Sequence, residues 1–254
     1  MPVCAPAPRD IVVACVVAGL KQFPLHPLHH VPPEHASLHA GIQLASPVAF
    51  KGFQHAGTEL WLEFGAASGI TARILAAHHH VHSFDSFHGL PELWRGMFDH
   101  RGKYQLNLLG KGAFGRQGKP PFPDGRGTNI TWHVGMYSDT VQPFMQRNKW
   151  PIRLVHVDCD LYSSTSTVFN AIAPRLAPGA LLVFDELINY PEFEAGEMRA
   201  LAELMQLTGR PIELIGTAAS VVAPNYTAAW HAVRNGEQSA WRRGYWQNAL
   251  VRLL

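Results

Sequence analysis

The chain has 254 residues, of which 47% are hydrophobic and 16% are charged, and its formal net charge is +2. This amount of apolar material is sufficient for one large α/β domain with a short appendage. The basic residues are scattered along the sequence, so there is no electrostatic footprint for nucleic acid. We therefore expect one core domain and no nucleic-acid partner.

The three cysteines, Cys4, Cys15 and Cys159, are an odd number and have neither metal-binding nor disulfide spacing. This usage is typical of a reducing compartment, so we expect a cytoplasmic protein without disulfides. The apolar run over residues 11–20 is too short to span a bilayer, and no small-residue cleavage pattern follows it. No membrane association is expected.

Two regions flank or interrupt the predicted core. Residues 1–56 contain one apolar run and a proline- and histidine-rich connector. They predict a helix and loops that cap the cleft in which an α/β domain of this kind would bind a cofactor. Residues 99–128 are rich in Gly, Lys and Pro and predict an irregular, lid-like surface loop. The main domain is expected over residues 57–254.

Short apolar runs and helical patterns alternate along the main domain, which is typical of a mostly parallel sheet buried on both faces. The segment 164–176 is expected to be capped by the hydroxyl cluster at Ser163, Ser164 and Thr165 and to end near Pro178 and Gly179. Segments 211–216 and 226–234 predict an antiparallel hairpin at the sheet edge, and the tail 241–254 predicts a last helix. The predicted strands are 60–64, 81–84, 130–134, 154–157 and 181–184, and the predicted helices are 70–77, 138–147, 164–176 and 194–208.

The stretch EFGAASG, residues 63–69, is the first candidate for ligand binding. An acidic residue closes a strand, and a glycine-containing turn then enters a helix, so backbone N–H groups can approach a ligand closely. Ala67 stands where the dinucleotide fingerprint G-x-G-x-x-G has its second glycine, which favours a nucleoside cofactor without phosphates. The alternative is a turn that only packs a helix onto a strand.

Acidic residues also follow three of the other predicted strands, 81–84, 154–157 and 181–184, and parallel α/β sheets bind ligands beyond these strand ends. Asp85 is placed to accept hydrogen bonds from ribose hydroxyls, or else to cap the turn that follows it. The later acids are suited to a hard divalent cation such as Mg²⁺, or else cap a helix and bind loop amides. The strand-closing acids are Glu63, Asp85, Asp158, Asp160, Asp185 and Glu186.

Six blocks occur in order between about residues 59 and 203: LEFGAASGITARILA, FDSFHGLPELW, GMYSDTVQPF, VHVDCDLYSSTSTVF, APGALLVFDE and GEMRALAE. This succession resembles the class I S-adenosylmethionine-dependent methyltransferases of the macrocin O-methyltransferase (TylF/MycF-like) family. The resemblance implies a Rossmann-like fold with a seven-stranded, mostly parallel sheet and an antiparallel edge hairpin. It also implies S-adenosylmethionine as the cofactor.

The resemblance further implies which residues bind the cofactor. The glycine loop would surround the methionine end, Asp85 would take the ribose and Gly135 would lie beside the adenine. The implied cofactor-binding residues are Glu63, Gly65, Ala66, Ser68, Gly69, Asp85, Ser86, Gly135 and Asp158.

Sugar O-methyltransferases of this family hold Mg²⁺ with acids after the fourth and fifth strands, and the matching residues here are Asp158, Asp185 and Glu186. Glu186 stands where those enzymes have a second Asp. Asp158 is the expected catalytic base, with Asp160 as the second candidate. We expect methyl transfer to a hydroxyl of a small molecule, a sugar or glycosylated metabolite, by a protein whose fold is compatible with a homo-oligomer. The alternatives are a metal-independent methyltransferase with another acceptor and a non-catalytic module that binds the cofactor.

Overall fold

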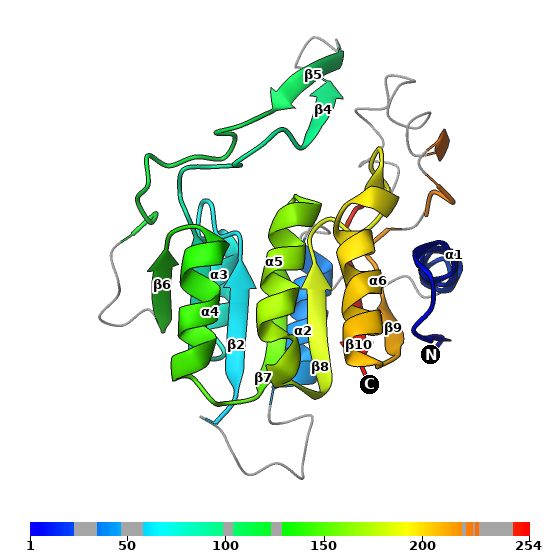
Figure 1. The fold of residues 1–254 in the computed structure, drawn as a ribbon, viewed down its shortest axis with the longest axis horizontal. Helices are drawn as coiled ribbons and strands as arrows, with labels where there is room; N and C mark the ends of the chain where they lie inside the picture. The colour runs from blue at the N-terminus through cyan, green and yellow to red at the C-terminus, as the bar shows by residue number, and fades with distance from the viewer. Residues whose placement is uncertain are drawn as a thin grey trace.

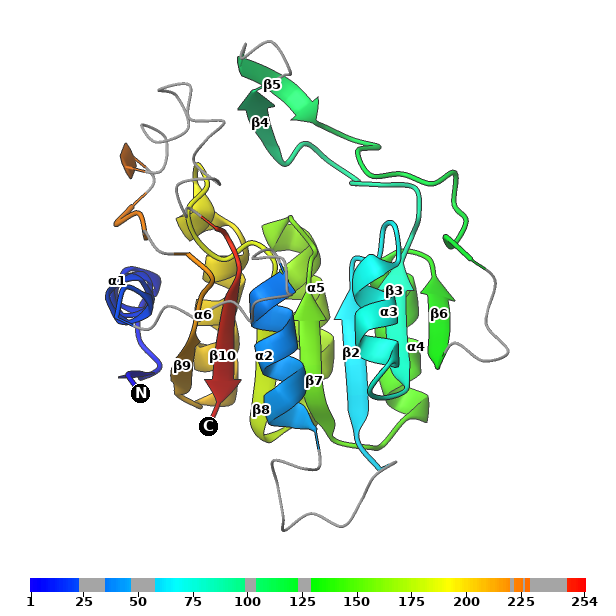
Figure 2. The ribbon, with the colours of Figure 1, turned by 180° about the vertical axis from the view of Figure 1, so that it is seen from behind.

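A central sheet with helices on both faces organises the molecule (Figures 1 and 2). The computed structural model describes residues 1–22, 35–46, 58–98, 104–122, 129–219, 222–225, 227–228 and 246–254. Within them the main sheet has eight strands in the order β1-β9-β10-β8-β7-β2-β3-β6. The predicted α/β class is confirmed, with one strand more than expected. The strands are β1 (Val3–Cys4), β2 (Leu60–Phe64), β3 (Val81–Asp85), β6 (Ile130–Val134), β7 (Ile152–Val157), β8 (Leu176–Phe184), β9 (Ile212–Gly216) and β10 (Ala249–Leu253).

Five neighbouring strands, β8, β7, β2, β3 and β6, run parallel. Every residue of β2 and of β7 is buried, as expected for short apolar strands that are covered on both faces. The chain builds β3 and β6 to one side of β2, and β7 and β8 to the other. The strand order therefore reverses between β2 and β7, which is where such sheets bind ligands.

Helices cover both faces of the sheet. Figure 1 shows α4 (Tyr137–Arg147), α5 (Tyr162–Ile172) and α6 (Glu197–Thr208) on one face. Figure 2 shows α2 (Ala36–Ala45) and α3 (Ile70–Ala76) on the other. Short 3-10 turns, η3 (Ala173–Arg175) and η4 (Phe193–Ala195), follow α5 and precede α6.

The predicted start and end of α5 are both corrected. Leu161 is the N-cap residue, and the Thr165 hydroxyl lies inside the first turns and donates to the Leu161 carbonyl at 3.0 Å. The hydroxyl cluster therefore does not cap the helix. Pro178 and Gly179 lie within β8, because the chain becomes extended from Leu176 onward.

The C-terminal segment is a strand and not the predicted helix. Ala249–Leu253 forms β10, which lies antiparallel between β8 and β9. Four of its five residues are buried, and a short buried apolar run gives no periodicity that separates strand from helix. The predicted hairpin partner, 226–234, lies largely outside the described residues.

The N-terminal segment belongs to the sheet. β1 pairs with β9 at the sheet edge, and α1 (Arg9–Leu20) packs against α6 and β9. A disulfide joins Cys4 to Cys15, so the expectation of no disulfide is wrong. The fold brings the two residues together across the β1–α1 connection. The cysteines therefore no longer support the prediction of a reducing compartment. No described helix is both long and apolar enough to cross a bilayer.

A separate two-stranded sheet lies beyond the carboxyl ends of the parallel strands (Figures 1 and 2). It consists of β4 (Arg95–Phe98) and β5 (Tyr104–Leu109), so the expectation of an irregular loop is wrong for residues 104–109. Residues 99–103 and 123–128 lie outside the described part of the chain. Near the C-terminal end of the region 99–128, the Arg73 guanidinium lies over the Phe122 ring, with its Cζ atom 4.2 Å from the ring centre.

Candidate active site

Backbone hydrogen bonds align the residues that follow the parallel strands. The Gly65 N–H donates to the Phe84 carbonyl at 3.0 Å, and the Asp158 N–H donates to the Phe64 carbonyl at 2.9 Å. The Asp185 N–H likewise donates to the Val157 carbonyl at 2.9 Å. Because the ladder continues one residue past the strands, the glycine loop and the later acids share one edge of the sheet.

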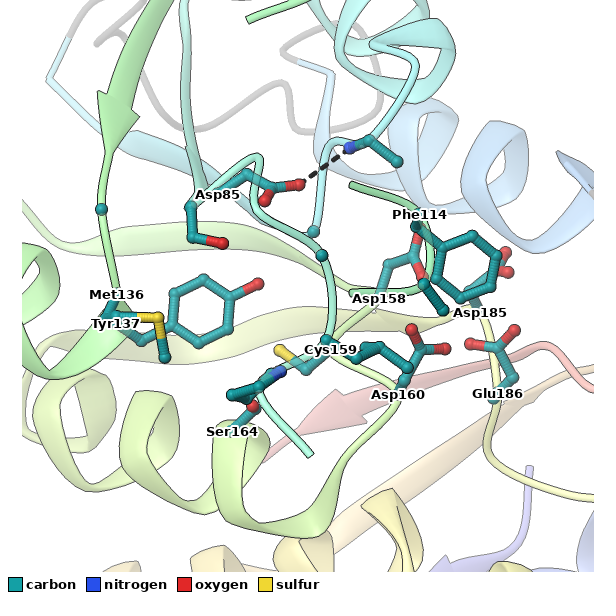
Figure 3. A pocket seen from close by; sticks show the side chains of 18 residues that line it. Asp85, Phe114, Met136, Tyr137, Asp158, Cys159, Asp160, Ser164, Asp185 and Glu186 are labelled. Atoms are coloured by element: carbon teal, nitrogen blue, oxygen red, sulfur yellow. Dashed lines mark hydrogen bonds between the residues drawn. The ribbon is translucent and has the colours of Figure 1, made fainter. Parts of the chain in front are cut away.

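A cavity of about 250 Å³ opens at this edge, at the reversal of strand order. Its walls come from the ends of β2, β3, β6, β7 and β8 and from the turns after Asp85 and Gly110. Figure 3 shows the side chains around it. The lining residues are Gly65, Ala67, Asp85, Ser86, Gly89, Leu90, Pro91, Ala113, Phe114, Gly135, Met136, Tyr137, Asp158, Cys159, Asp160, Ser164, Asp185 and Glu186.

The glycine loop is held by a close backbone contact. Gly65 has φ +91°, and a Cβ atom there would lie 1.7 Å from the Asp158 carbonyl oxygen. Only glycine fits this position, because the obstacle is backbone and cannot rotate away. The β2 turn and the β7 turn thereby meet at the floor of the cavity.

Asp85 ties the glycine loop to the end of β3. Its Oδ2 accepts the N–H groups of Ala66 and Ala67, each at 2.9 Å, and its Oδ1 accepts the Phe87 N–H at 2.7 Å. The capping alternative is therefore realised through Phe87. Asp85 is only partly buried and also lines the cavity, so its remaining lone pairs can face a ligand.

The predicted cofactor residues divide into two groups. Gly65, Asp85, Ser86, Gly135 and Asp158 line the cavity, whereas Glu63, Ala66, Ser68 and Gly69 do not.

Glu63 lies within β2, before the glycine turn at Gly65. In the strand register it is paired with Ser83 of β3 and His156 of β7. It is fully buried, accepts the Ser83 hydroxyl and lies 3.5 Å from the Nδ1 atom of His156. Gly69 is covered by Pro121 and Phe122, whose atoms would lie within 3 Å of a Cβ atom there. These two residues therefore shape the loop from outside the cavity.

Three acidic side chains converge on the other side of the cavity. Ligand oxygens of Asp158, Asp160 and Glu186 all lie within 4.8 Å of one another. Figure 3 shows the carboxylates of Asp160 and Glu186 pointing toward each other. Asp158 and Glu186 are two of the expected metal ligands, and Asp160 takes the place of Asp185, which lines the cavity beside them.

Asp160 reaches the cluster through an unusual backbone conformation. It has φ +62°, and the Leu161 N–H donates to the Cys159 carbonyl at 2.6 Å, so the chain is not extended there. Asp158 and Asp160 therefore approach each other through a turn and not along an extended strand.

Ionising all three carboxyl groups of the cluster together is electrostatically unfavourable. Burial raises the pKa of Asp158 well above its usual range, and the nearby Asp185 and Asp160 raise it further. The pKa of Glu186 is raised in the same way. Burial raises the pKa of Asp160 to about 7, although the Arg95 guanidinium opposes this shift. Among the residues that the structure describes, the buried Glu186 Oε2 atom has no hydrogen-bond partner. An all-carboxylate donor set suits a hard divalent cation.

Several lining residues carried no clear signal in the sequence. Phe114 has φ +63° and is half exposed, and it lines the same cavity as the acids (Figure 3). Met136 and Tyr137 follow β6 and form the opposite wall, where Tyr137 packs edge-on against Phe64 at 5.8 Å. Burial raises the pKa of Tyr137, so its hydroxyl stays protonated and can donate. The block GMYSD after a strand end was the only available hint.

Comparison with known proteins adds a domain match. Residues 62–187, from β2 to just beyond β8, match the family model of a methyltransferase domain. No curated protein matches the sequence.

Solved structures of methyltransferases resemble the chain at low identity. The calicheamicin methyltransferase CalS11 has 17% identity and a TM-score of 0.48, covering 82% of this chain and 89% of its own. The O-methyltransferase NovP has 16% identity and a TM-score of 0.44, covering 78% and 89%. The N-methyltransferase NodS from Bradyrhizobium japonicum WM9, in complex with S-adenosyl-l-homocysteine, has 17% identity and a TM-score of 0.38, covering 76% and 85%. These TM-scores are below 0.5, so the likenesses carry no argument about substrates.

The five parallel strands, from β2 to β8, and the glycine turn after β2 coincide closely with the matched stretch, residues 62–187. The protein therefore has the α/β Rossmann-like methyltransferase fold, with a methyltransferase domain matched over residues 62–187.

Proposed function

We propose that the protein is an S-adenosylmethionine-dependent O-methyltransferase that methylates a hydroxyl of a small molecule with the help of Mg²⁺. One observation supports this function above all others. A single cavity contains both the glycine turn of the matched methyltransferase domain and three carboxylates close enough to share a cation.

The proposed place of the methyl donor follows from the walls of the cavity. Asp85 and Ser86 are the candidates for the ribose hydroxyls, since both line the cavity at the end of β3. Met136 and Tyr137, beside Gly135, offer apolar and aromatic surface for the adenine. Gly65 permits close approach of the methionine end to the Asp158 turn. This arrangement would direct the methyl group toward the acids.

The acceptor hydroxyl would lie among Asp158, Asp160 and Glu186, which would hold Mg²⁺. Bound Mg²⁺ would lower the pKa of the hydroxyl and fix its position. The hydroxyl oxygen attacks the methyl carbon, the C–S bond breaks with its electron pair on sulfur, and S-adenosylhomocysteine leaves. Asp158 takes the hydroxyl proton as general base. The main contribution of the chain is alignment, because the sulfonium methyl is already activated.

The acceptor class rests on the motif resemblance. The FDSFHGLPE and DCDLYSST blocks are similar to those of sugar O-methyltransferases, and both supply lining residues. The first block supplies Asp85, Ser86, Gly89 and Leu90, and the second supplies Asp158, Cys159, Asp160 and Ser164. A sugar or another polyhydroxylated small molecule is therefore the proposed acceptor.

A thermal-shift series tests this function. S-adenosylmethionine and S-adenosylhomocysteine should each raise the melting temperature, because a ligand that binds only the folded state stabilises it. Mg²⁺ should raise it further, and NAD should not change it. Stabilisation by NAD without any response to the methyl donor would contradict the proposal, and a response to the donor without one to Mg²⁺ would favour a metal-independent methyltransferase.

A further inference from the structure

Glu197 is a fully buried acid next to the cavity that does not line it. It is the first residue of α6, directly after the N-cap Gly196, and belongs to the GEMRALAE block, to which no role was assigned. Burying a carboxyl group is costly unless its oxygens are hydrogen-bonded. Among the described residues the Oε2 atom of Glu197 has no hydrogen-bond partner, so the partners of Oε1 indicate what the residue does.

The Oε1 atom of Glu197 accepts the backbone N–H of Cys159 at 3.1 Å. Cys159 is the middle residue of the Asp158–Cys159–Asp160 turn, so this bond fixes the peptide between the two acids of the cluster. The same Oε1 atom accepts the Thr165 hydroxyl at 3.2 Å, from the first turns of α5. One oxygen thus joins the start of α6, the acidic turn and the start of α5.

The turn held by this oxygen needs such support. Asp160 has φ +62°, a conformation that is unfavourable for a residue with a Cβ atom and persists only where the surroundings impose it. Without an acceptor at this point, the Cys159 N–H would be left unpaired among buried groups. The turn could then relax, and the Asp158 and Asp160 carboxylates would move apart.

We propose that Glu197 is a positioning residue that holds Asp158 and Asp160 in the arrangement that binds the cation. It acts as a hydrogen-bond acceptor behind the site and does not itself touch the cation or the substrate. The inference rests on the proposed cation site and adds the residue that maintains its geometry. Groups behind a metal site typically change metal affinity by about 10- to 100-fold when they are removed.

The test compares Glu197→Leu with Glu197→Gln in Mn²⁺ and S-adenosylhomocysteine titrations of the full chain. Leu has no acceptor, so Mn²⁺ affinity should fall about 10-fold or more. Gln keeps a carbonyl oxygen at the same place, so its Mn²⁺ affinity should stay within about threefold of the wild type. Binding of S-adenosylhomocysteine should stay within about threefold in both variants, because Gly65 and Asp85 are untouched.

Two further variants sharpen the comparison. Glu203→Leu makes the same change on the same helix, where the side chain is 41% exposed and pairs with Arg199. Glu203 also accepts the Tyr162 hydroxyl at the start of α5, but it accepts no backbone N–H of the acidic turn among the described contacts, so Mn²⁺ affinity should be unchanged. Thr165→Val removes the second donor to Glu197 and should weaken Mn²⁺ binding by a smaller factor than Glu197→Leu.

A folded Glu197→Leu with wild-type Mn²⁺ affinity would overturn the proposal. A 10-fold loss of Mn²⁺ affinity in Glu197→Gln would also overturn the proposal. This measurement decides the question if the Glu197→Leu variant does not fold. Failure of the wild type to bind Mn²⁺ would instead overturn the cation site of the proposed function.

Discussion

At the scale of single residues, the cavity depends on places where backbone approaches backbone. Gly65 is the clearest case, since its turn lies against the carbonyl of Asp158. Side chains then act on this fixed frame. Asp85 accepts the amides of the glycine loop, and Glu197 accepts the amide between the two acids of the next turn.

Replacing Gly65 by Ala should destabilise the fold by about 2–4 kcal/mol, from the left-handed backbone and from the collision with the Asp158 carbonyl. Gly112→Ala is the matched control, because Gly112 has φ +86° but no atom of the described residues lies within 4 Å of a Cβ atom placed there. It should cost only the backbone strain, about 1–2 kcal/mol. Urea denaturation measures both. Equal costs would show that the contact with Asp158 has no effect.

Asp158→Asn should abolish methyl transfer and weaken Mn²⁺ binding strongly, because it removes both a ligand and the proposed base. Binding of S-adenosylhomocysteine should remain within a few-fold, since the glycine loop and Asp85 keep their contacts. Calorimetric titrations of the two ligands separate these effects. Asp139→Asn, on the exposed first turn of α4, is the control for the change of charge. Retained transfer in Asp158→Asn would remove Asp158 from the mechanism.

At the scale of elements, the strand-loop-helix units around the cavity follow closely from the sequence, and the C-terminal strand does not. The predicted strand 60–64 and the helix that begins at residue 70 agree with β2 and α3. A short apolar run followed by a glycine turn is compatible with few other local conformations. β10 could not be predicted, because its place between β8 and β9 is decided by contacts distant in sequence. The Cys4–Cys15 disulfide was missed for a different reason, because the odd number and the spacing of the cysteines gave no sign that the β1–α1 connection brings these two together.

Asn248 connects the elements that were hardest to predict. Its Oδ1 atom accepts the Ser37 hydroxyl of α2 at 2.7 Å and the Ala218 N–H at 3.2 Å, and the residue is buried. Asn248→Ala leaves one buried and one partly buried donor without this acceptor and should destabilise the fold by about 2–4 kcal/mol. Ser37→Ala removes only one donor and should cost about 1 kcal/mol. Chemical denaturation measures the difference. An Asn248→Ala variant no less stable than Ser37→Ala would contradict this role.

At the scale of the whole molecule, the prediction of the fold was better than that of the site. The alternation of apolar runs and helices defines the sheet, and the strand ends then place the acids on one edge. Whether a given side chain reaches the cavity depends on backbone details that no pattern reveals. Glu63 turns into the sheet interior against Ser83, and Asp160 enters the cluster through its left-handed backbone.

The pH dependence of the free energy of unfolding tests the burial of His82, which does not line the cavity. Burial, with the neighbouring His133, lowers the pKa of His82 from 6.5 to about 4. The unfolded chain therefore binds the proton more readily, so the contribution of His82 is complete above pH 6.5 and is lost as the pH falls toward about 4. The loss should be about 1–2 kcal/mol, allowing for the partial exposure of the ring.

His82→Gln should reduce the loss of stability between these pH values, and His78→Gln, which alters an exposed histidine nearby, should not. Urea denaturation at a series of pH values measures both slopes. An unchanged slope in His82→Gln would contradict the lowered pKa.

The central claim is that one cavity holds the methyl donor on the glycine-loop side and a cation on the acidic side. A crystal structure with S-adenosylhomocysteine and Mn²⁺, with anomalous difference density to locate the metal, tests this most directly. We expect the nucleoside between Asp85 and Tyr137, and a manganese peak among Asp158, Asp160 and Glu186. A nucleoside bound elsewhere, or manganese absent from these three carboxylates at saturating concentration, would contradict the account.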